Sequence, residues 1–254
     1  MDRECTLGNS KAKALTLILT TAISSMFPSC ATYGVKERGP SADITPFIKR
    51  FIAQHENRLG ESRQLIFATS SDAGPALITI HTLEKGFGSW HVVFPPFPAS
   101  IGEGGFAAID KKKEGDGKSP SGIFPLGTAF GYQPSVVTLL PYRQVMDDDF
   151  WVDDVDSENY NQWVKGKPNA ASFEKMRRDD DQHKFGLVIE YNMRPIVKGK
   201  GSAIFLHVWK GGRPTVGCVA VPEEMILKLL AWLNPLKKPM IIMGIEAELL
   251  AANP

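Results

Sequence analysis

The sequence predicts a mainly β domain with a few flanking helices, that is, a β-rich α+β fold. Short runs rich in β-branched and aromatic residues recur between residues 63 and 244, and clusters of Gly, Pro, Ser or Asp separate them. Two segments, near residues 45–60 and 222–234, instead repeat apolar residues at helical spacing. With 254 residues and 43% hydrophobic content, the chain can bury a full core.

The first residues predict an export signal. A polar leader with Arg3, Lys11 and Lys13 precedes an apolar run over residues 14–27. This run is too short and too rich in Thr and Ser to span a bilayer comfortably, so we expect a signal peptide over residues 1–31. A buried core helix is the alternative.

Two ways of processing this leader remain open. The stretch FPSC resembles a lipobox in which Cys30 accepts a lipid, and this outcome predicts a membrane tether. The stretch SCA before Thr32 suits an ordinary signal peptidase, and this outcome predicts a protein without that tether.

The charge of the chain gives no indication of a nucleic-acid partner. The formal net charge is +1, and removal of residues 1–31 subtracts three basic and two acidic residues, which leaves 0. A neutral chain offers no electrostatic reason to bind nucleic acid or an anionic surface. We therefore expect no nucleic-acid partner, and no pattern indicates an oligomeric state.

The elements follow from local patterns. Residues 32–61 are expected to form a linker and an amphipathic helix, with Thr45 as N-cap, Pro46 at the first helical position and Gly60 as the stop. Residues 62–245 are expected to form the main domain, with a mainly antiparallel sheet, and residues 246–254 a C-terminal tail. Strands are predicted within residues 63–70, 75–86, 89–96, 121–127, 184–192, 202–209 and 238–244, and a helix over 222–234.

Residues 142–184 differ from the rest because acidic and aromatic residues are dense there. We expect an insertion or capping region. Its acids, Asp153 and Asp154 among them, form either a solvated face or a site for a substrate ammonium group. An EF-hand loop that starts at Asp154 has Lys165 at its twelfth position, so the sequence does not support a calcium site.

Cys218 is the cysteine expected within the folded body, because Cys5 lies in the leader and Cys30 in the processing region. A single thiol cannot form an internal disulfide. In an exported protein such a thiol is either buried and inert or has a chemical role.

The neighbours of Cys218 favour the chemical role. The stretch KGGRP predicts a tight turn, after which TVGCVAV returns as an antiparallel segment and brings His207 close to Cys218. An imidazole in that position takes the thiol proton. Gly217 would leave its own N–H and that of Cys218 facing a developing oxyanion. A zinc site is the weaker interpretation, because further ligands at metal-binding spacing are missing. Strand alternation places Phe205, His207 and Trp209 on one face and the aliphatic Ile204, Leu206 and Val208 on the other.

The stretch FLHVWKGGRPTVGCVAV resembles the catalytic segment of the YkuD-type L,D-transpeptidases, in which an upstream His joins a downstream S/T-x-G-C motif. It is closest to the branch with T-x-G-C-V-A. The stretch DGKSPSGIFPLGTAFGY is similar to the family's T-P-x-G-x-F element, and WVDDVDSENYNQWV to a segment of the same branch. The resemblance covers residues 62–245. It implies an L,D-transpeptidase-like β-sandwich or barrel in the bacterial cell envelope, possessing a cysteine nucleophile and acting on peptidoglycan stem peptides.

The chain departs from the better-known members at two positions. Those members carry S-H-G-C and an Arg two residues after the Cys, whereas this chain has Val216 and Ala220. We therefore expect Arg213, or the acidic segment around Asp153 and Asp154, to take over substrate binding. Thr215 and Trp209 are further candidate substrate-binding residues, with aromatic core packing as the alternative for Trp209.

The expected reaction is acyl transfer without a metal or organic cofactor. Cys218 attacks the carbonyl of the third residue of a tetrapeptide stem, and His207 protonates the departing D-Ala amine. An L,D-transpeptidase results if an amine resolves the thioester, and an L,D-carboxypeptidase or related peptidoglycan hydrolase results if water does. A non-catalytic envelope lipoprotein, with Cys218 as core filler, is the remaining alternative.

Overall fold

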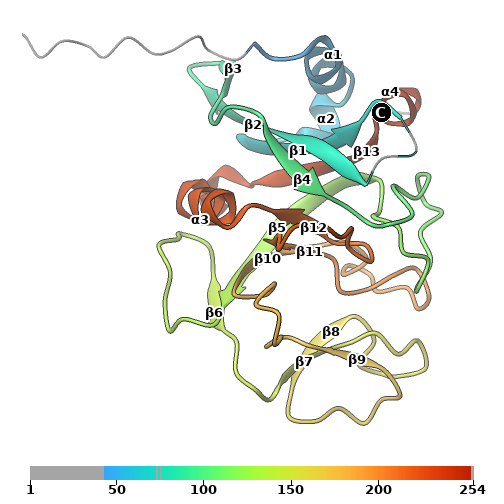
Figure 1. The fold of residues 1–254 in the computed structure, drawn as a ribbon. Helices are drawn as coiled ribbons and strands as arrows, with labels where there is room; N and C mark the ends of the chain where they lie inside the picture. Colours follow the sequence, from blue (N-terminus) through green and yellow to red (C-terminus); the bar gives the residue numbers. More distant parts are fainter. Residues whose placement is uncertain (1–42, 73, 75, 253–254) are drawn as a thin grey trace, which may run out of the picture. The chain divides into compact units, whose positions relative to one another are not determined.

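Strands dominate the computed structural model, which describes residues 43–252 except residues 73 and 75 (Figure 1). The prediction of a mainly β fold with a few helices is confirmed. The strands are β1 (Gln64–Ser70), β2 (Leu77–Gly86), β3 (Ser89–Val92), β4 (Phe97–Ser100), β5 (Gly122–Gly131), β6 (Tyr142–Gln144), β7 (Asp149–Val152), β8 (Gln162–Lys165), β9 (Phe173–Lys175), β10 (Phe185–Ile189), β11 (Phe205–Val208), β12 (Val219–Val221) and β13 (Met240–Ile245). The helices are α1 (Pro46–Gln54), α2 (Glu56–Leu59), α3 (Glu223–Trp232) and α4 (Glu246–Ala251), and a 3₁₀ turn, η1, covers Pro235–Lys237. The expected signal peptide over residues 1–31, with Cys30, lies outside the described residues.

The large sheet closes on itself as a barrel. Its hydrogen-bonded neighbours follow the order β1-β13-β5-β10-β11-β12-β4-β2, and β2 in turn pairs with β1. β3 extends from β2 as a hairpin, and β6 pairs with β5. Most pairs are antiparallel as expected, while β1–β13, β5–β6 and β11–β12 are parallel. Closure pairs both sides of each strand in the ring, so the barrel gives the site a rigid frame.

The pairing of β11 with β12 corrects the sequence-based expectation of an antiparallel hairpin. Their register is parallel, with His207 opposite Ala220. The glycine-rich stretch after β11 does not close a tight turn. Instead Thr215 bonds to the chain that follows β4, donating its N–H to the carbonyl of Ile101 at 2.9 Å and accepting from Glu103 N–H at 2.8 Å. These bonds carry the chain back along the sheet before it enters β12 in the direction of β11, as parallel pairing requires.

α1 and α4 cover one side of the barrel, and α3 adds to its main core. Thr45 caps α1 by accepting the Ile48 N–H at 3.2 Å, as predicted. The predicted helix is interrupted at His55 and continues as α2 up to Gly60. α1 and α4 cover the outer face of β1 and β13 in a second apolar cluster, whose buried members are Ile48, Phe51, Leu59, Leu65, Phe67, Leu83, Ile242 and Leu249. Residues 246–251 are therefore a helix packed on the core and not the expected tail.

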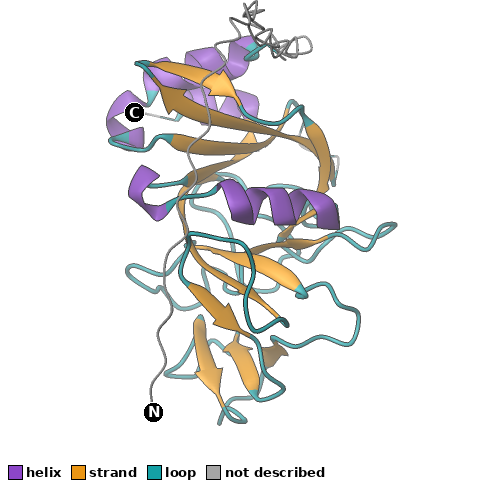
Figure 2. Ribbon diagram, turned by 90° about the vertical axis from the view of Figure 1, so that its left-hand side faces the viewer, coloured by secondary structure: helices purple, strands orange, loops and turns teal. Residues whose placement is uncertain are grey.

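The acidic region forms a separate small sheet, in the order β8-β7-β9, below the barrel in both views (Figures 1 and 2). Trp151 of β7 and Met176, next to β9, join Phe130 of β5 and Phe205 of β11 in a third apolar cluster. The small sheet therefore packs on the face of β11 that carries Phe205. Asp149 anchors it from a buried position, where it accepts hydrogen bonds from Trp163 Nε1 at 2.9 Å and Arg143 Nη2 at 2.5 Å.

Candidate active site

His207 and Cys218 lie on the same face of the barrel wall. Leu206 pairs with Val219 and His207 with Ala220, so Phe205 is the residue opposite Cys218. Cys218 Sγ accepts a hydrogen bond from Phe205 N–H at 3.4 Å, which confirms this register. The imidazole and the sulfur therefore belong to alternate positions of adjacent strands, separated by roughly 6.6 Å along the strand direction. No hydrogen bond joins them within the part of the chain that the structure describes.

The same register confirms the predicted alternation of side chains along β11. Leu206 and Val208 belong to the main apolar cluster together with Val219 and Val221 of β12. Phe205 belongs to the other cluster, against which Cys218 packs. The candidate catalytic face is thus the outer face of the barrel under the small sheet.

The Cys218 thiol is protonated in this environment. It donates to the carbonyl of Ala203 at 3.2 Å, and the residue is half-buried. Burial raises the pKa of the Cys218 thiol to about 12, and the charge of Glu174 contributes to the rise. Attack by this sulfur therefore requires a base that removes its proton as the bond forms, since a stable thiolate at neutral pH is not available.

His207 has the protonation state that such a base needs. Its Nδ1 lies 2.9 Å from the carbonyl of Val208, which only accepts, so Nδ1 carries the hydrogen and Nε2 carries the lone pair. Burial lowers the pKa of His207 to about 4, although the hydrogen bond to Val208 opposes this effect. The imidazole is consequently neutral near pH 7 and presents Nε2 as a proton acceptor.

A second histidine, His183, supports the first. It is 2% exposed, and its ring packs edge-on against His207 with 5.5 Å between ring centroids. Its Nδ1 lies 3.1 Å from the carbonyl of Met176, and Nε2 lies 3.6 Å from Glu174 Oε1. Burial lowers the pKa of His183 well below its usual value, and the charge of His207 adds to this. His183 thus packs against the ring of His207 and restricts its orientation. Because His183 is neutral, it adds no charge to the site.

Glu174 brings a carboxylate from the small sheet toward this pair. Arg178 Nη1 donates to Glu174 at 2.7 Å, and Arg178 also binds Asp180 through two nitrogens at 2.7 and 3.0 Å. Burial raises the pKa of Glu174, although Arg178 opposes the rise. Sequence reasoning missed His183, Glu174 and Arg178, because they lie in a region whose acidic composition indicated only a solvated or ammonium-binding surface.

The backbone around the thiol is held by two hydroxyl groups. Ser119 Oγ donates to the carbonyl of Gly217 at 2.7 Å, and Thr215 Oγ1 donates to that of Cys218 at 2.7 Å. The N–H of Gly217 donates to Thr215 Oγ1 at 3.2 Å. This bond corrects the expectation that the Gly217 N–H faces an oxyanion. The structure records no acceptor for the N–H of Cys218 among the described residues, so this amide remains the candidate oxyanion donor.

A glycine is required at position 217 because the backbone of Lys118 lies very close to it. Its φ is +148°, and a Cβ built there would lie 3.0 Å from the carbonyl oxygen of Lys118. A side chain at this position would therefore push the two segments apart.

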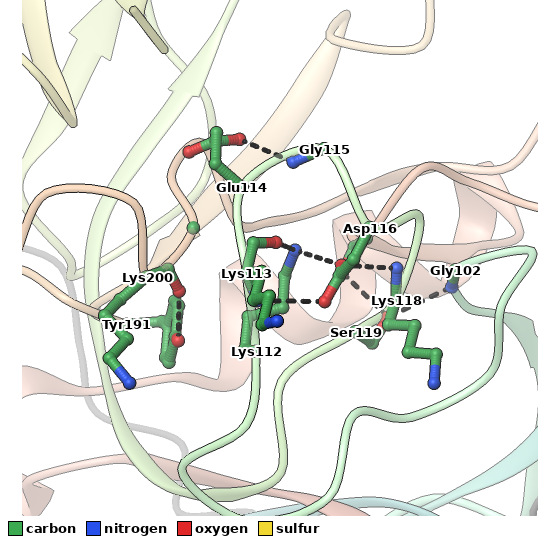
Figure 3. A network of polar contacts seen from close by, with 12 residues as sticks. Gly102, Lys112, Lys113, Glu114, Gly115, Asp116, Lys118, Ser119, Tyr191 and Lys200 are labelled. Atoms are coloured by element: carbon green, nitrogen blue, oxygen red, sulfur yellow. Dashed lines mark hydrogen bonds and ion pairs between the residues drawn. The ribbon is translucent and has the colours of Figure 1, made fainter. Parts of the chain in front are cut away.

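An ion pair organises the loop that delivers Ser119 (Figure 3). Lys112 is 5% exposed, and its Nζ donates to Asp116 Oδ1 at 2.6 Å and to its neighbour's carbonyl at 2.8 Å. Asp116 also accepts the N–H of Lys118 at 2.9 Å. Ser119 then accepts the N–H of Gly102 at 3.0 Å. The sequence indicated only turns here, because the long-range partners of this loop are not adjacent in sequence.

The remaining candidate substrate-binding residues fall into two places. Trp209, Arg213 and Thr215 share a hollow of about 370 Å³ at the end of β11, with Ala220 in its lining. Asp153 and Asp154 are not part of that lining. Asp154 accepts the N–H groups of Ala171 and Asp156 at 2.7 and 3.0 Å and so stabilises its own loop.

Asp153 is a half-buried carboxyl close to Glu174. Burial raises the pKa of Asp153. Its charge contributes to the raised pKa of Glu174. Within the described residues, no group of three or more His, Cys, Asp or Glu side chains is placed to hold a metal ion. None of the helices in this part of the chain is long and apolar enough to cross a membrane.

A comparison with protein families matches residues 90–242 to the L,D-transpeptidase catalytic domain, YkuD. The match includes every residue of the site described above. The chain belongs to this family. The L,D-transpeptidase catalytic domains are peptidoglycan-modifying enzymes that generally act outside the cytoplasm, and the predicted resemblance is confirmed.

Two solved structures are similar to this L,D-transpeptidase-type chain. Both are of the helical cell shape determining protein Pgp2 from Campylobacter jejuni, one of them a point variant. Sequence identity is 17% and 16%, with TM-scores of 0.38 and 0.36. The matches cover 74% and 77% of this chain but only 52% and 56% of the Pgp2 chains, so this chain spans about half of their length. No curated protein matches the chain.

Proposed function

We propose that this domain is a cysteine-dependent acyltransferase that acts on the tetrapeptide stems of peptidoglycan. The observation that carries the proposal is the placement of His207 and Cys218 on one face of the barrel, in alternate positions of paired strands. Family membership supplies peptidoglycan as the substrate class.

The first step is attack on the carbonyl of the third stem residue. The thiol leaves the carbonyl of Ala203 by rotation about its Cα–Cβ bond and gives its proton to Nε2 of His207 while sulfur bonds to carbon. The negative charge that forms on the carbonyl oxygen is stabilised by the N–H of Cys218. Ser119 fixes the peptide group that contains this amide, and Thr215 fixes the next one, so the amide is oriented before substrate arrives.

The second step releases the terminal residue. The tetrahedral intermediate collapses, the bond to the D-Ala nitrogen breaks, and that nitrogen takes the proton from His207. A thioester on Cys218 and free D-Ala result. An amine of a neighbouring stem or a water molecule then attacks the thioester, His207 accepts the proton of this nucleophile, and the thiol is restored.

The neutral pair of thiol and imidazole determines how this mechanism responds to pH. His207 accepts a proton only when it is neutral, which holds above about pH 4, and the thiol remains protonated up to about pH 12. The rate of thioester formation is therefore expected to be flat across neutral pH and not to peak there.

The decisive experiment incubates the full chain with sacculi that bear tetrapeptide stems and analyses the muropeptides. Formation of 3,3-crosslinks identifies an L,D-transpeptidase, and conversion of tetrapeptides to tripeptides identifies an L,D-carboxypeptidase. Cys218→Ala and His207→Gln variants are expected to lose either product, with Lys49→Gln on α1 as the matched control that retains it. Unchanged muropeptides with the folded wild-type chain overturn the proposal.

A non-catalytic envelope protein is the second candidate. The observation that favours it is the raised pKa of Cys218, since an inert buried thiol has the same property. A carbapenem, which acylates catalytic thiols of this kind of site, separates the two candidates by intact mass. A stoichiometric adduct that disappears in His207→Gln supports the enzyme, and no adduct supports the binding protein.

We also propose that the chain is exported and either released or tethered through a lipid on Cys30. The apolar run over residues 14–27 and the stretch FPSC support this proposal. Intact mass of the protein from a bacterial membrane fraction tests it, because a diacylglycerol on a new N-terminus at Cys30 and a chain that begins at Thr32 have different masses.

A further inference from the structure

Ala203, the residue that accepts the thiol hydrogen of Cys218, has an unusual backbone conformation. Its φ is +53°, in the left-handed region that residues with a Cβ rarely adopt. Its carbonyl oxygen lies 3.2 Å from the sulfur that donates to it. Because the backbone angles of a residue determine where its carbonyl points, whatever holds Ala203 in this conformation also determines where the thiol is directed.

The side chain of Asn161, which directly precedes β8, provides this support. Asn161 is 1% exposed, and its Oδ1 accepts the N–H of Ala203 at 3.1 Å. Oδ1 also accepts Trp151 Nε1 at 2.9 Å, and Nδ2 donates to the carbonyl of Asn192 at 2.8 Å. An indole N–H only donates and a carbonyl only accepts, so these partners determine which end of the amide is the oxygen. Asn161 therefore presents a fixed acceptor to Ala203.

Tyr160, the preceding residue, anchors the same stretch of chain. Its hydroxyl accepts the N–H of Gly201 at 3.0 Å and donates to Glu114 at 2.5 Å. Two consecutive side chains thus accept the N–H groups of Gly201 and Ala203, alternate positions that a neighbouring strand would bind in a sheet. The chain that leads into β11 is consequently held by side chains from the region of the small sheet.

This arrangement directs the resting thiol away from its base. The sulfur lies between two backbone groups, the carbonyl of Ala203 and the N–H of Phe205. His207 follows on the same face, on the opposite side of Phe205 from Ala203. A thiol carries one hydrogen, so it cannot donate to Ala203 and to His207 at the same time. The two acceptors therefore compete for a single proton.

We propose that Asn161 is a positioning residue that holds the Cys218 thiol in a resting orientation, bonded to Ala203 and not to His207. Its effect on turnover rests on the proposed function, because the thiol must leave Ala203 before it gives its proton to His207. The carbonyl of Ala203 stabilises the thiol but not the thiolate, so the same contact protects the sulfur from electrophiles. The segment WVDDVDSENYNQWV thereby acts on the nucleophile through one amide side chain.

The S–H stretching band in a Raman spectrum tests the resting orientation without requiring turnover. Its wavenumber falls when the thiol donates a hydrogen bond. Subtracting the spectrum of the matching Cys218→Ser chain isolates the band of Cys218 from those of Cys5 and Cys30 in the full chain. We expect the band to move to higher wavenumber in Asn161→Ala. The matched control is Trp151→Phe, which removes the other donor from the same Oδ1 and is expected to leave the band in place.

Alkylation by iodoacetamide at pH 8, followed by peptide mass, gives a second measurement. We expect Cys218 to react about threefold to tenfold faster in Asn161→Ala and at the wild-type rate in Trp151→Phe, with thermal unfolding to show that both variants are folded. Asn161→Asp keeps an acceptor for Ala203 and is expected to retain the wild-type band. If Asn161→Ala does not fold, Asn161→Ser replaces it, because the shorter hydroxyl does not reach Ala203.

Three results would overturn the inference: a free-thiol band in the wild-type chain, an unshifted band with a wild-type alkylation rate in the Ala or Ser variant, or equal changes in Trp151→Phe. Release of D-Ala by the wild-type chain is measured alongside. A band that shifts in Asn161→Ala while the wild-type chain releases no D-Ala contradicts the proposed function and leaves the resting orientation of the thiol standing.

Discussion

The hydroxyl of Ser119 donates a hydrogen bond of 2.7 Å to the carbonyl oxygen of Gly217, and both groups are buried. This contact ties the loop before β5 to the peptide that precedes the nucleophile. The same oxygen accepts the N–H of Gly102, so one hydroxyl joins three segments of the chain. The orientation of the Cys218 amide thus depends on a residue outside the segment that contains His207 and Cys218.

Replacement of Ser119 by Ala is therefore expected to lower both stability and the rate of D-Ala release. The carbonyl of Gly217 and the N–H of Gly102 lose their partner while buried, which costs about 1–3 kcal/mol. Thermal unfolding and single-turnover release of D-Ala measure the two effects. Ser119→Thr retains the hydroxyl and is expected to recover most of the rate. An Ala variant that is as fast as wild type would show that this bond does not orient the site.

Gly217→Ala is expected to reduce the rate of acylation more than the stability of the barrel. The new methyl group would meet the carbonyl of Lys118 at 3.0 Å, and the φ of +148° disfavours any side chain. Gly115→Ala is a useful control, because that glycine also has a positive φ of +70° but no neighbouring atom within 4 Å. Carbapenem acylation followed by mass should slow at least tenfold in the first variant only. Equal rates in both variants would contradict the role of the close approach.

Alkylation of Cys218 by iodoacetamide is expected to accelerate steadily as pH rises. With a thiol pKa of about 12, the thiolate fraction grows about tenfold per pH unit between pH 7 and 10. In a denaturant the same thiol should level off near its ordinary pKa of about 8.5. Rates measured across this range by mass check the expectation. A plateau of the native protein below pH 9 would be evidence for a stabilised thiolate.

Glu174→Gln is expected to make the thiol more reactive. Its negative charge contributes to the raised pKa of Cys218, after the larger effect of burial, and the amide keeps the shape and the hydrogen bond to Arg178. A decrease of the thiol pKa by one unit would raise the alkylation rate about tenfold at fixed pH. We expect about a threefold to tenfold increase at pH 8, compared with no change in Glu56→Gln on α2. A slower reaction in the Glu174 variant would refute this effect.

Asp149 is expected to make the stability of the small sheet depend on pH. Although burial opposes the shift, hydrogen bonds from Met146 N–H, Trp163 and Arg143 lower the pKa of Asp149 below 3.8. A carboxyl with a lowered folded pKa stabilises the protein above its unfolded pKa and loses this contribution as pH falls through the folded pKa. Asp149→Asn should therefore cost about 1–3 kcal/mol near pH 7 and progressively less below about pH 4. Thermal unfolding followed across pH tests this, and a constant difference between the two proteins would argue against it.

Local patterns were sufficient to predict most strands and the start of α1, because alternation and capping depend on neighbours in sequence. Thr45 bonds to a residue three positions away, and its role was visible in the sequence. The direction of β12 was not visible, because a glycine-rich stretch suits both a hairpin and a crossing connection. The contact that decides between them joins Thr215 to Ile101, far upstream.

The sequence predicted the two central residues of the candidate site but not the groups that support them. His207 and Cys218 could be found because their residue types and spacing form a motif. The supporting groups His183, Glu174 and Ser119 come from other elements, and only folding brings them together. Asp154 belongs to an acidic segment whose composition suggested ligand binding, but its carboxylate accepts hydrogen bonds from the backbone of its own loop.

Because β11 and β12 pair in parallel, different residues determine the placement of the catalytic pair and the choice of peptide substrate. The ladder keeps the nucleophile and its base in register, whereas the intervening residues 210–214 connect the two strands and line the hollow. An exchange of this short stretch for another sequence should leave the chemistry intact and alter which peptides are accepted. Selection, natural or in the laboratory, can thus vary specificity here in the way that immunoglobulin loops vary on a constant framework.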